Sequence, residues 1–235
     1  PTGKIAITSG IQSGPTRVGV YGAAGVGKTS LVAGLKDIGR RPVLVDLERG
    51  SWNVDIDRIE GVEVWDQLLT LLADDSTFAN YDTIAIDTFT AAEQLATTWI
   101  PKNVKTDKGD TVARIEHYGW AAGYGYILEE MTKLMQALDR HVRAGRSVIA
   151  IMHSCTSTVP NPAGDDYIRH EPLLMQVGNK AQLRSKVVGW LDYLLFVGYD
   201  VSVDRGGVAR GSGTRTIFTE ELPWLLAKRR KLLPH

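Results

Sequence analysis

Short apolar runs alternate along the chain with longer stretches in which apolar residues recur every three to four positions. Four runs rich in valine, isoleucine and alanine are predicted as strands, at residues 17–21, 41–48, 81–88 and 146–154. Ile84, Ala85 and Ile86 are consecutive apolar residues, which is typical of a strand buried on both faces. Strands that alternate with helices form βαβ units. The pattern therefore predicts an α/β fold with a mostly parallel sheet and helices on both faces.

Helical periodicity occurs in five stretches, and two further strands are predicted near the C-terminus. The predicted helices cover residues 28–36, 66–75, 90–100, 118–142 and 180–191. The third helix ends before Pro101, because a proline disfavours the helical conformation in the residue before it. Residues 192–200 and 214–220 flank a glycine-rich turn and predict a C-terminal β-hairpin. Residues 61–65 and 173–177 are weaker strand candidates.

Two segments without periodicity are predicted as long loops. Residues 101–115 are polar and charged, and residues 154–172 contain Pro160, Pro162 and Gly164. Loops of this length are uncommon in a compact domain and are often functional. Both segments are therefore candidates for binding a partner.

The composition is that of a globular protein without a dominant charge. The chain has 235 residues, 43% of them hydrophobic, with 27 basic and 27 acidic side chains. This length favours a single domain over residues 1–235, with 1–15 as an N-terminal extension and 220–235 as a basic C-terminal tail. Cys155 is the only cysteine, which excludes an internal disulfide. We found no signal-peptide core and no apolar run of membrane length, so we expect a cytoplasmic protein without a membrane partner.

The stretch GAAGVGKT, Gly22 to Thr29, matches the nucleotide-binding pattern G-x-x-x-x-G-K-[ST] in full. It follows a predicted strand and opens a predicted helix, which is the context that this motif requires. In such loops backbone N–H groups approach phosphate oxygens, the lysine reaches the β- and γ-phosphates, and the hydroxyl binds Mg²⁺. The residues expected to bind nucleotide are Gly22, Ala23, Ala24, Gly25, Val26, Gly27, Lys28, Thr29 and Ser30. ATP with Mg²⁺ is the expected ligand, because no guanine-reading motif follows the later strands.

Polar residues at the ends of predicted strands supply the other parts of an ATPase site. Asp87 is the expected magnesium aspartate, together with Thr29. Many ATPases place a glutamate directly after this aspartate, but Thr88 stands there, so Glu48 is the expected catalytic base. His153 is expected to sense the γ-phosphate. The alternatives are that Asp87 caps the next helix, that Glu48 makes a surface ion pair, and that His153 has no partner.

The order of these features resembles that of the RecA-like ATPases. The segments that carry a closer resemblance are YGAAGVGKTSL, DTIAIDTFTA, YGWAAGYG, SVIAIMHS and TRTIFTEELPWLLAKRRKLLP. Together they resemble the phage-encoded, RecA-like ATP-binding proteins linked to homologous recombination and single-strand annealing. The resemblance spans nearly the whole chain. It implies a RecA-like core and an ATPase that binds single-stranded DNA and assists phage recombination or annealing in the host cytoplasm.

The resemblance also implies two DNA-binding loops and a homo-oligomer, either a filament or a ring. The loops correspond to residues 101–125 and 154–171, and basic side chains near aromatic ones suit single-stranded DNA. The candidate DNA contacts are Lys102, Lys105, Lys108, Arg114 and Arg169. The candidates for a cation that reaches the γ-phosphate of a neighbouring protomer are Lys180, Arg184 and Lys186. A single-strand annealing or binding protein is a further expected partner.

Two other functions remain open. A small-molecule or nucleotide kinase also begins with this glycine loop, but kinases usually close arginine-rich lids over their substrates, and neither loop is arginine-rich. A non-hydrolysing, nucleotide-dependent assembly switch would keep Lys28 and Asp87 without using Glu48.

Overall fold

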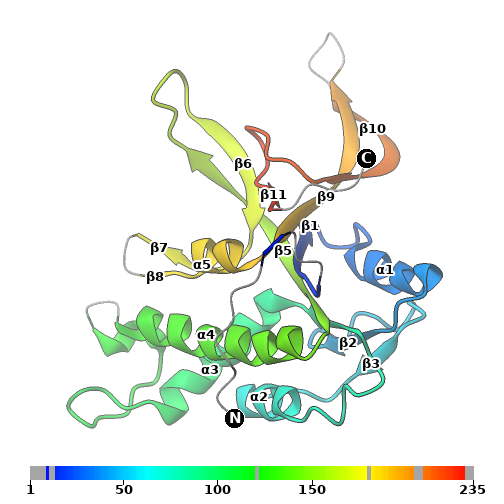
Figure 1. Ribbon diagram of the computed structural model, residues 1–235. Coiled ribbons are helices and arrows are strands. Elements are labelled where there is room, and N and C mark those ends of the chain that lie inside the picture. The colour runs from blue at the N-terminus through cyan, green and yellow to red at the C-terminus, as the bar shows by residue number, and fades with distance from the viewer. Residues whose placement is uncertain (1–8, 11–13, 120–121, 179–180, 204–208, 231–235) are drawn as a thin grey trace.

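Figure 1 shows the computed structural model of the chain, which describes residues 9–10, 14–119, 122–178, 181–203 and 209–230. Nine of the described strands form one sheet in the order β10-β9-β1-β5-β4-β2-β3, with β11 paired to β9 and β6 paired to β5. The five contacts that join β9, β1, β5, β4, β2 and β3 are parallel, whereas β10, β11 and β6 are antiparallel to their partners. The predicted mostly parallel α/β sheet is therefore confirmed.

The bounds of the strands are β1 (Arg17–Gly22), β2 (Pro42–Asp46), β3 (Asp57–Ile59), β4 (Thr83–Asp87), β5 (Ser147–Val159), β6 (Tyr167–Pro172), β7 (Gln176–Val177), β8 (Ala181–Gln182), β9 (Tyr193–Val203), β10 (Ala209–Phe218) and β11 (Lys228–Arg229). The helices are α1 (Lys28–Ala33), η1 (Gly34–Ile38), α2 (Trp65–Ala73), α3 (Phe89–Asn103), η2 (Ile115–Tyr118), α4 (Ala122–Arg143) and α5 (Leu183–Trp190), where η marks a 3₁₀ turn.

The two faces of the sheet are covered by different helices. Ile84 and Ile86 of β4 belong to a large core cluster that includes residues of α2, α3 and α4, the three helices on the lower side in Figure 1. Ala85 points to the other face, where it packs in a smaller cluster with Val26 of the glycine loop and Val32 of α1. Because both faces are buried, the strand has no polar side and reads as a continuous apolar run.

The weak strand candidate at residues 61–65 was wrong. The strand in this region, β3, lies upstream, and Trp65 instead begins α2. The Trp65 side chain is fully buried, and its Nε1–H donates a hydrogen bond to Glu130 Oε2 on α4 at 2.8 Å. This tertiary contact favours the helix over the strand suggested by the valine and tryptophan.

The prediction that the third helix ends before Pro101 was also wrong. Helix α3 continues through Pro101 to Asn103, and both Ile100 and Pro101 are buried. The Tyr118 hydroxyl lies 3.1 Å from the Ile100 carbonyl oxygen and 2.5 Å from that of Val104, so it satisfies an acceptor at the helix end. Burial and this contact offset the local preference of the residue before a proline. The segment that remains without helix or strand, residues 104–114, is shorter than expected.

The second predicted loop, residues 154–172, is largely a β-hairpin. Beyond Ser154, β5 leaves the parallel sheet and pairs with β6 in antiparallel register from Ser154↔Pro172 to Val159↔Tyr167. This hairpin projects at the upper left of Figure 1. This half of β5 contains two threonines and a valine, which have high strand propensity. The prolines and glycine that suggested a loop fall in the hairpin turn.

The predicted C-terminal hairpin is present as β9 and β10, with Phe218↔Phe196 and Arg215↔Tyr199 among its cross-strand pairs. The segment after β10 returns along the sheet. Its Leu225 is fully buried, and Lys228 Nζ donates to the carbonyl oxygens of Val188 and Leu191 at 2.6 and 2.7 Å. Part of the basic tail is thus packed on the fold.

Candidate functional site

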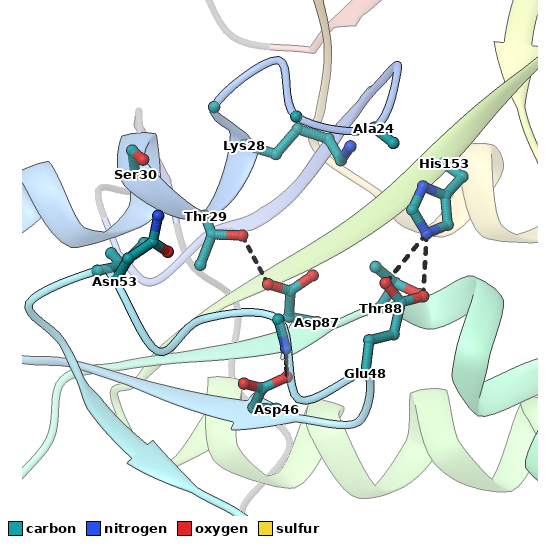
Figure 2. Close-up of a pocket in the computed structure, with 14 residues that line it drawn as sticks. Ala24, Lys28, Thr29, Ser30, Asp46, Glu48, Asn53, Asp87, Thr88 and His153 are labelled. Carbon is teal, nitrogen blue, oxygen red and sulfur yellow. Dashed lines mark hydrogen bonds and ion pairs between the residues drawn. The ribbon is translucent and has the colours of Figure 1, made fainter.

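The candidate site lies where β1, β2, β4 and β5 end, at one edge of the parallel sheet (Figure 2). The register places Gly22 beside His153 and Asp46 beside Asp87. Carboxyl ends of neighbouring parallel strands are where α/β proteins bind ligands. The side chains meet around a cavity of about 330 Å³.

The glycine loop runs from the end of β1 to α1. Gly25 and Gly27 have φ angles of 73° and 98°, which L side chains rarely adopt, so these two glycines are needed for the shape of the loop. Gly25, Gly27, Lys28, Thr29 and Ser30 all line the cavity, as does Ala24. Gly22, Ala23 and Val26 do not line it, because Gly22 and Val26 are buried and Ala23 faces a second cavity.

Lys28 is buried, with an exposed fraction of 6%. Its Nζ donates hydrogen bonds to the backbone oxygens of Gly22 and Ala23 at 3.1 and 2.8 Å. Burial lowers the pKa of Lys28, and the negative charges of Asp87 and Glu48 partly oppose that shift. A buried ammonium held only by carbonyl groups is poorly compensated, and a phosphate oxygen at the cavity would supply the missing negative charge.

Thr29 and Asp87 form a direct contact across the site, in which Thr29 Oγ1 donates to Asp87 Oδ2 at 2.7 Å. Burial raises the pKa of the Asp87 carboxyl, the hydrogen bond from Thr29 lowers it, and the charges of Glu48 and Asp46 raise it further. A hydroxyl and a carboxylate are hard oxygen ligands of the kind that Mg²⁺ prefers.

The described residues contain no group of three or more histidine, cysteine, aspartate or glutamate side chains placed to hold a metal ion. Mg²⁺ is usually bound through one or two carboxylates together with phosphate oxygens and water. The Thr29–Asp87 pair fits this second arrangement.

Asp46 and Glu48, at the end of β2 and just after it, make different contacts. Asp46 is 2% exposed and accepts hydrogen bonds from Gly50 N–H, Ser51 N–H and the Ser51 hydroxyl, so it holds the turn after β2. Glu48 instead reaches into the cavity, where its Oε1 accepts a hydrogen bond from Thr88 Oγ1 at 2.7 Å. The peptide bond between Asp87 and Thr88 is cis.

His153 completes the group on the other side of Glu48. Its Nε2 lies 2.9 and 3.1 Å from the two carboxylate oxygens of Glu48, and Figure 2 shows both contacts. Its backbone N–H donates to Thr90 Oγ1 at 3.2 Å, which anchors the end of the parallel part of β5. The structure thus brings together the site residues expected from the glycine loop and from three separate strands.

Sequence reasoning missed several residues of this site. Asn53 and Val54 enter the cavity from the loop after β2, and Thr88 positions Glu48. Arg215 of β10 lies against Gly27 of the glycine loop. Thr88 was noted only as the residue that stands in place of a glutamate. Nothing in the local sequence around Arg215 indicates its proximity to Gly27, because the two are 188 positions apart in the printed sequence.

The candidate DNA contacts occupy two separate regions. Lys102, Lys105, Lys108 and Arg114 are all exposed, around the loop that follows α3. This loop is separated from Asp87 by a 15-residue helix, which corresponds to about 20 Å. Arg169 lies on β6, where it forms ion pairs with Glu171 and Glu221. Trp120 lies outside the described residues.

The candidates for a cation acting on a neighbouring protomer are in different environments. Arg184 pairs with the buried Glu171 and donates to the Leu174 carbonyl oxygen, so its guanidinium is already engaged within the chain. Lys186 is exposed and donates to Thr132 Oγ1 at 2.7 Å. Lys180 lies outside the described residues.

The fold and the site together define a RecA-like P-loop protein: a mostly parallel sheet, a glycine loop after β1, and an aspartate at the end of β4 beside the loop threonine. The sequence matches the AAA_24 family, described as an AAA domain, over residues 14–231. The chain therefore belongs to this family of P-loop nucleotide-binding domains.

Solved structures and curated proteins say less about this chain than the family match does. The flagellar accessory protein FlaH from Methanocaldococcus jannaschii is similar in structure, with 10% sequence identity, a TM-score of 0.44, and coverage of 89% of this chain and 80% of that one. No curated protein matches the sequence. Among the described residues, no helix has the length and apolar character needed to cross a membrane.

Proposed function

We propose that the protein binds ATP with Mg²⁺ and hydrolyses it at the site formed by the glycine loop, Asp87, Glu48 and His153. One observation carries this proposal: two groups of side chains meet at the same cavity. The first is the Thr29 hydroxyl with the Asp87 carboxylate, and the second is the Glu48 carboxylate, which Thr88 and His153 hold in place. A protein that only binds nucleotide would need the first group but not the second.

The residues have distinct roles in this proposal. The loop backbone and Lys28 hold the phosphates, and Thr29 with Asp87 would hold the metal ion, which when bound neutralises charge on the phosphates. Glu48 accepts a proton from the attacking water, because it is a carboxylate that projects into the cavity and is fixed by Thr88 and His153. His153 exchanges its contact with Glu48 for a γ-phosphate oxygen.

Steady-state ATP hydrolysis and nucleotide affinity, measured with the purified protein, test the proposal. The Lys28→Ala variant is the inactive reference, and Lys36→Ala is a matched control, because Lys36 is a lysine near the same helix that pairs with the exposed Asp55. We expect turnover in the wild type and the control but not in Lys28→Ala. Binding without turnover would instead favour a nucleotide-dependent switch, and phosphate transfer to a small molecule would favour a kinase.

We further propose that the protein binds single-stranded DNA and assists phage recombination or annealing, as a homo-oligomer. The resemblance to phage-encoded RecA-like proteins supports this role, as does the exposure of Lys102 at the end of α3 and of Lys105, Lys108 and Arg114 on the loop that follows it. Basic side chains that track a phosphate backbone give binding that weakens steeply with salt. A single-strand annealing or binding protein is the proposed protein partner.

A fluorescent oligonucleotide tests the DNA proposal. Replacing these four basic residues by serine should weaken binding and reduce its salt dependence, whereas replacing Arg40 and Arg41, directly before β2, and Arg58, on β3, should not. ATPase stimulation by DNA should disappear with the first set only. An unchanged affinity in the first set would contradict this assignment of the DNA surface without affecting the ATPase proposal.

A further inference from the structure

Arg215 on β10 lies against the glycine loop of its own chain. A Cβ atom built on Gly27 would be 3.2 Å from Arg215 Nη1, 3.7 Å from Cζ and 3.9 Å from Cδ. The guanidinium group is therefore in contact range of the backbone directly before Lys28. Gly27 is one of the two loop glycines with positive φ, and the absence of a side chain there also leaves room for Arg215.

The hairpin geometry explains how this arginine reaches the loop. β9 is parallel to β1 and pairs Val197 with Gly22, where the glycine loop begins. β10 then pairs Arg215 with Tyr199 of β9, directly after an irregularity in the register between Gly211 and Arg215. Such irregularities redirect side chains at the edge of a sheet. Val26 and Val197 pack in the same buried cluster, so the loop and the hairpin lie together.

Arg215 is exposed and forms no hydrogen bond or ion pair with any described residue. Its guanidinium is therefore available to an anion bound at the adjacent glycine loop. Arginine matches phosphate oxygens with a planar fork of donors, which makes it well suited to such an anion. Arg169 and Arg229, by contrast, are already paired with glutamates.

We propose that Arg215 binds the α- and β-phosphates of the nucleotide held by the glycine loop of the same chain. This proposal rests on the proposed nucleotide-binding function. The backbone of such a loop cradles the α- and β-phosphates, whereas the γ-phosphate lies toward the catalytic carboxylate, here Glu48. Arg215 lies in contact range of Gly27 in that backbone, whereas the side chains that contact Glu48 are Thr88 and His153.

In this role Arg215 differs from a residue that senses the γ-phosphate. ATP and ADP both contain the α- and β-phosphates, so Arg215 contributes equally to the affinity for each. Nucleotide binding also ties β10 to the glycine loop through this side chain. The C-terminal hairpin is then held more firmly whenever ATP or ADP is bound.

The test measures dissociation constants for ATP and ADP in Mg²⁺ by titration calorimetry, with wild type, Arg215→Ala, Arg215→Lys and Arg229→Ala. Arg229 is the matched control, because it is an exposed arginine near the same hairpin that pairs with Glu220. We expect Arg215→Ala to weaken ATP and ADP alike, by about tenfold, with Arg215→Lys in between and Arg229→Ala unchanged. Amide hydrogen exchange in β10 should slow on ADP binding in the wild type but not in Arg215→Ala.

Three outcomes would contradict the proposal, and they are distinguishable. Unchanged affinity for both nucleotides in Arg215→Ala, while Lys28→Ala abolishes binding, would overturn the contact and leave the nucleotide site intact. Weakening of ATP alone would overturn the assignment to the α- and β-phosphates. Absence of binding in the wild type would remove the proposed function and this inference together. Melting curves without nucleotide check that the variants remain folded, which the exposure of Arg215 leads us to expect.

Discussion

His153 Nε2 lies 2.9 Å from Glu48 Oε1, although the two residues are 105 positions apart in the chain. Glu48 is at the end of one strand and His153 at the end of another, with β4 between them in the sheet. Thr88 donates to the same carboxylate oxygen from the end of β4. Glu48 is thus held at the cavity by one partner from the neighbouring strand β4 and one from β5, the strand beyond it.

This relationship predicts the behaviour of a double-mutant cycle. Glu48→Gln should reduce ATP turnover by about 10²–10⁴-fold with little change in ATP affinity, because a general base acts on the chemical step. His153→Ala should lower the preference for ATP over ADP even in the Glu48→Gln background, as expected of a γ-phosphate contact. If His153→Ala has no effect once Glu48 is replaced, His153 acts only by positioning Glu48.

The Thr29–Asp87 contact predicts the requirements for magnesium. Thr29→Val keeps the shape of the side chain but removes the hydroxyl, and Asp87→Asn removes the charge. Both should abolish the Mg²⁺-dependent part of ATP affinity, whereas Thr29→Ser should retain it. The Mg²⁺ dependence of ATP affinity is measured by titrating MgCl₂ into the protein with ATP, with an EDTA-treated sample as the reference. Normal Mg²⁺ dependence in Asp87→Asn would contradict its role as a metal ligand.

Glycine substitutions should distinguish a position where a side chain would collide with another strand from one where the backbone conformation itself favours glycine. A Cβ at Gly22 would lie 2.2 Å from the backbone oxygen of Val197, so Gly22→Ala has to displace β9 and should destabilise the fold by about 1–3 kcal/mol or more. Gly25→Ala meets nothing within 4 Å, but its φ of 73° should cost about 1–2 kcal/mol.

Gly34→Ala is the control for this pair. Gly34 has a right-handed helical conformation, and alanine there should be neutral or stabilising by about 0.4–1 kcal/mol. Urea denaturation of the three variants gives the comparison. Equal stability of Gly22→Ala and Gly34→Ala would contradict the close approach of β1 and β9.

The buried His141 predicts a pH-dependent stability. It is 0% exposed, its Nε2 lies 2.9 Å from the Leu72 carbonyl oxygen, and its Nδ1 lies 3.2 Å from Arg146 Nη1, so the neutral ring satisfies both contacts. Burial lowers the pKa of His141 in the folded state, and the hydrogen bond to Leu72 partly opposes this. Below about pH 6.5 the unfolded state therefore binds a proton that the folded state does not.

The free energy of unfolding should then fall as the pH drops from about 6.5, with a limiting slope near 1.4 kcal/mol per pH unit for this one group. Above that pH His141 makes no contribution to the slope. His141→Gln should flatten the profile between pH 5 and 6.5, whereas replacing the exposed His117 should not. If the free energy of unfolding depends on pH in the same way in wild type and His141→Gln, groups other than His141 cause the loss of stability at low pH.

Several features of the protein were determined by the sequence itself. The glycine loop was predictable because its chemistry requires particular residues at fixed spacing, and the structure places it directly after β1. The continuous apolar runs of β2, β4 and the first half of β5 identified buried parallel strands, because both of their faces are covered. A mostly parallel α/β sheet followed from their alternation with helices.

Other features depended on contacts between distant parts of the chain. The hairpin of β5 and β6 forms where prolines and a glycine suggested a loop, and α3 passes through Pro101 because burial and Tyr118 compensate the helix end. Local propensity differs between alternatives by about 1 kcal/mol for most residues and by about 3 kcal/mol for a proline inside a helix, so the packing of several residues can override it.

The same distinction applies to the site. Lys28, Thr29 and Asp87 were recognisable from local patterns, but the pairing of Glu48 with His153, the turn-holding role of Asp46 and the approach of Arg215 to Gly27 were not. The Glu48–His153 and Arg215–Gly27 contacts depend on the strand order β10-β9-β1-β5-β4-β2, which no local pattern specifies, whereas Asp46 holds a turn formed by the residues that directly follow it. The sequence thus determined which phosphate-binding chemistry is present, while the tertiary structure decided which distant side chains act on it, because only folding brings strand ends and hairpins to one edge of the sheet.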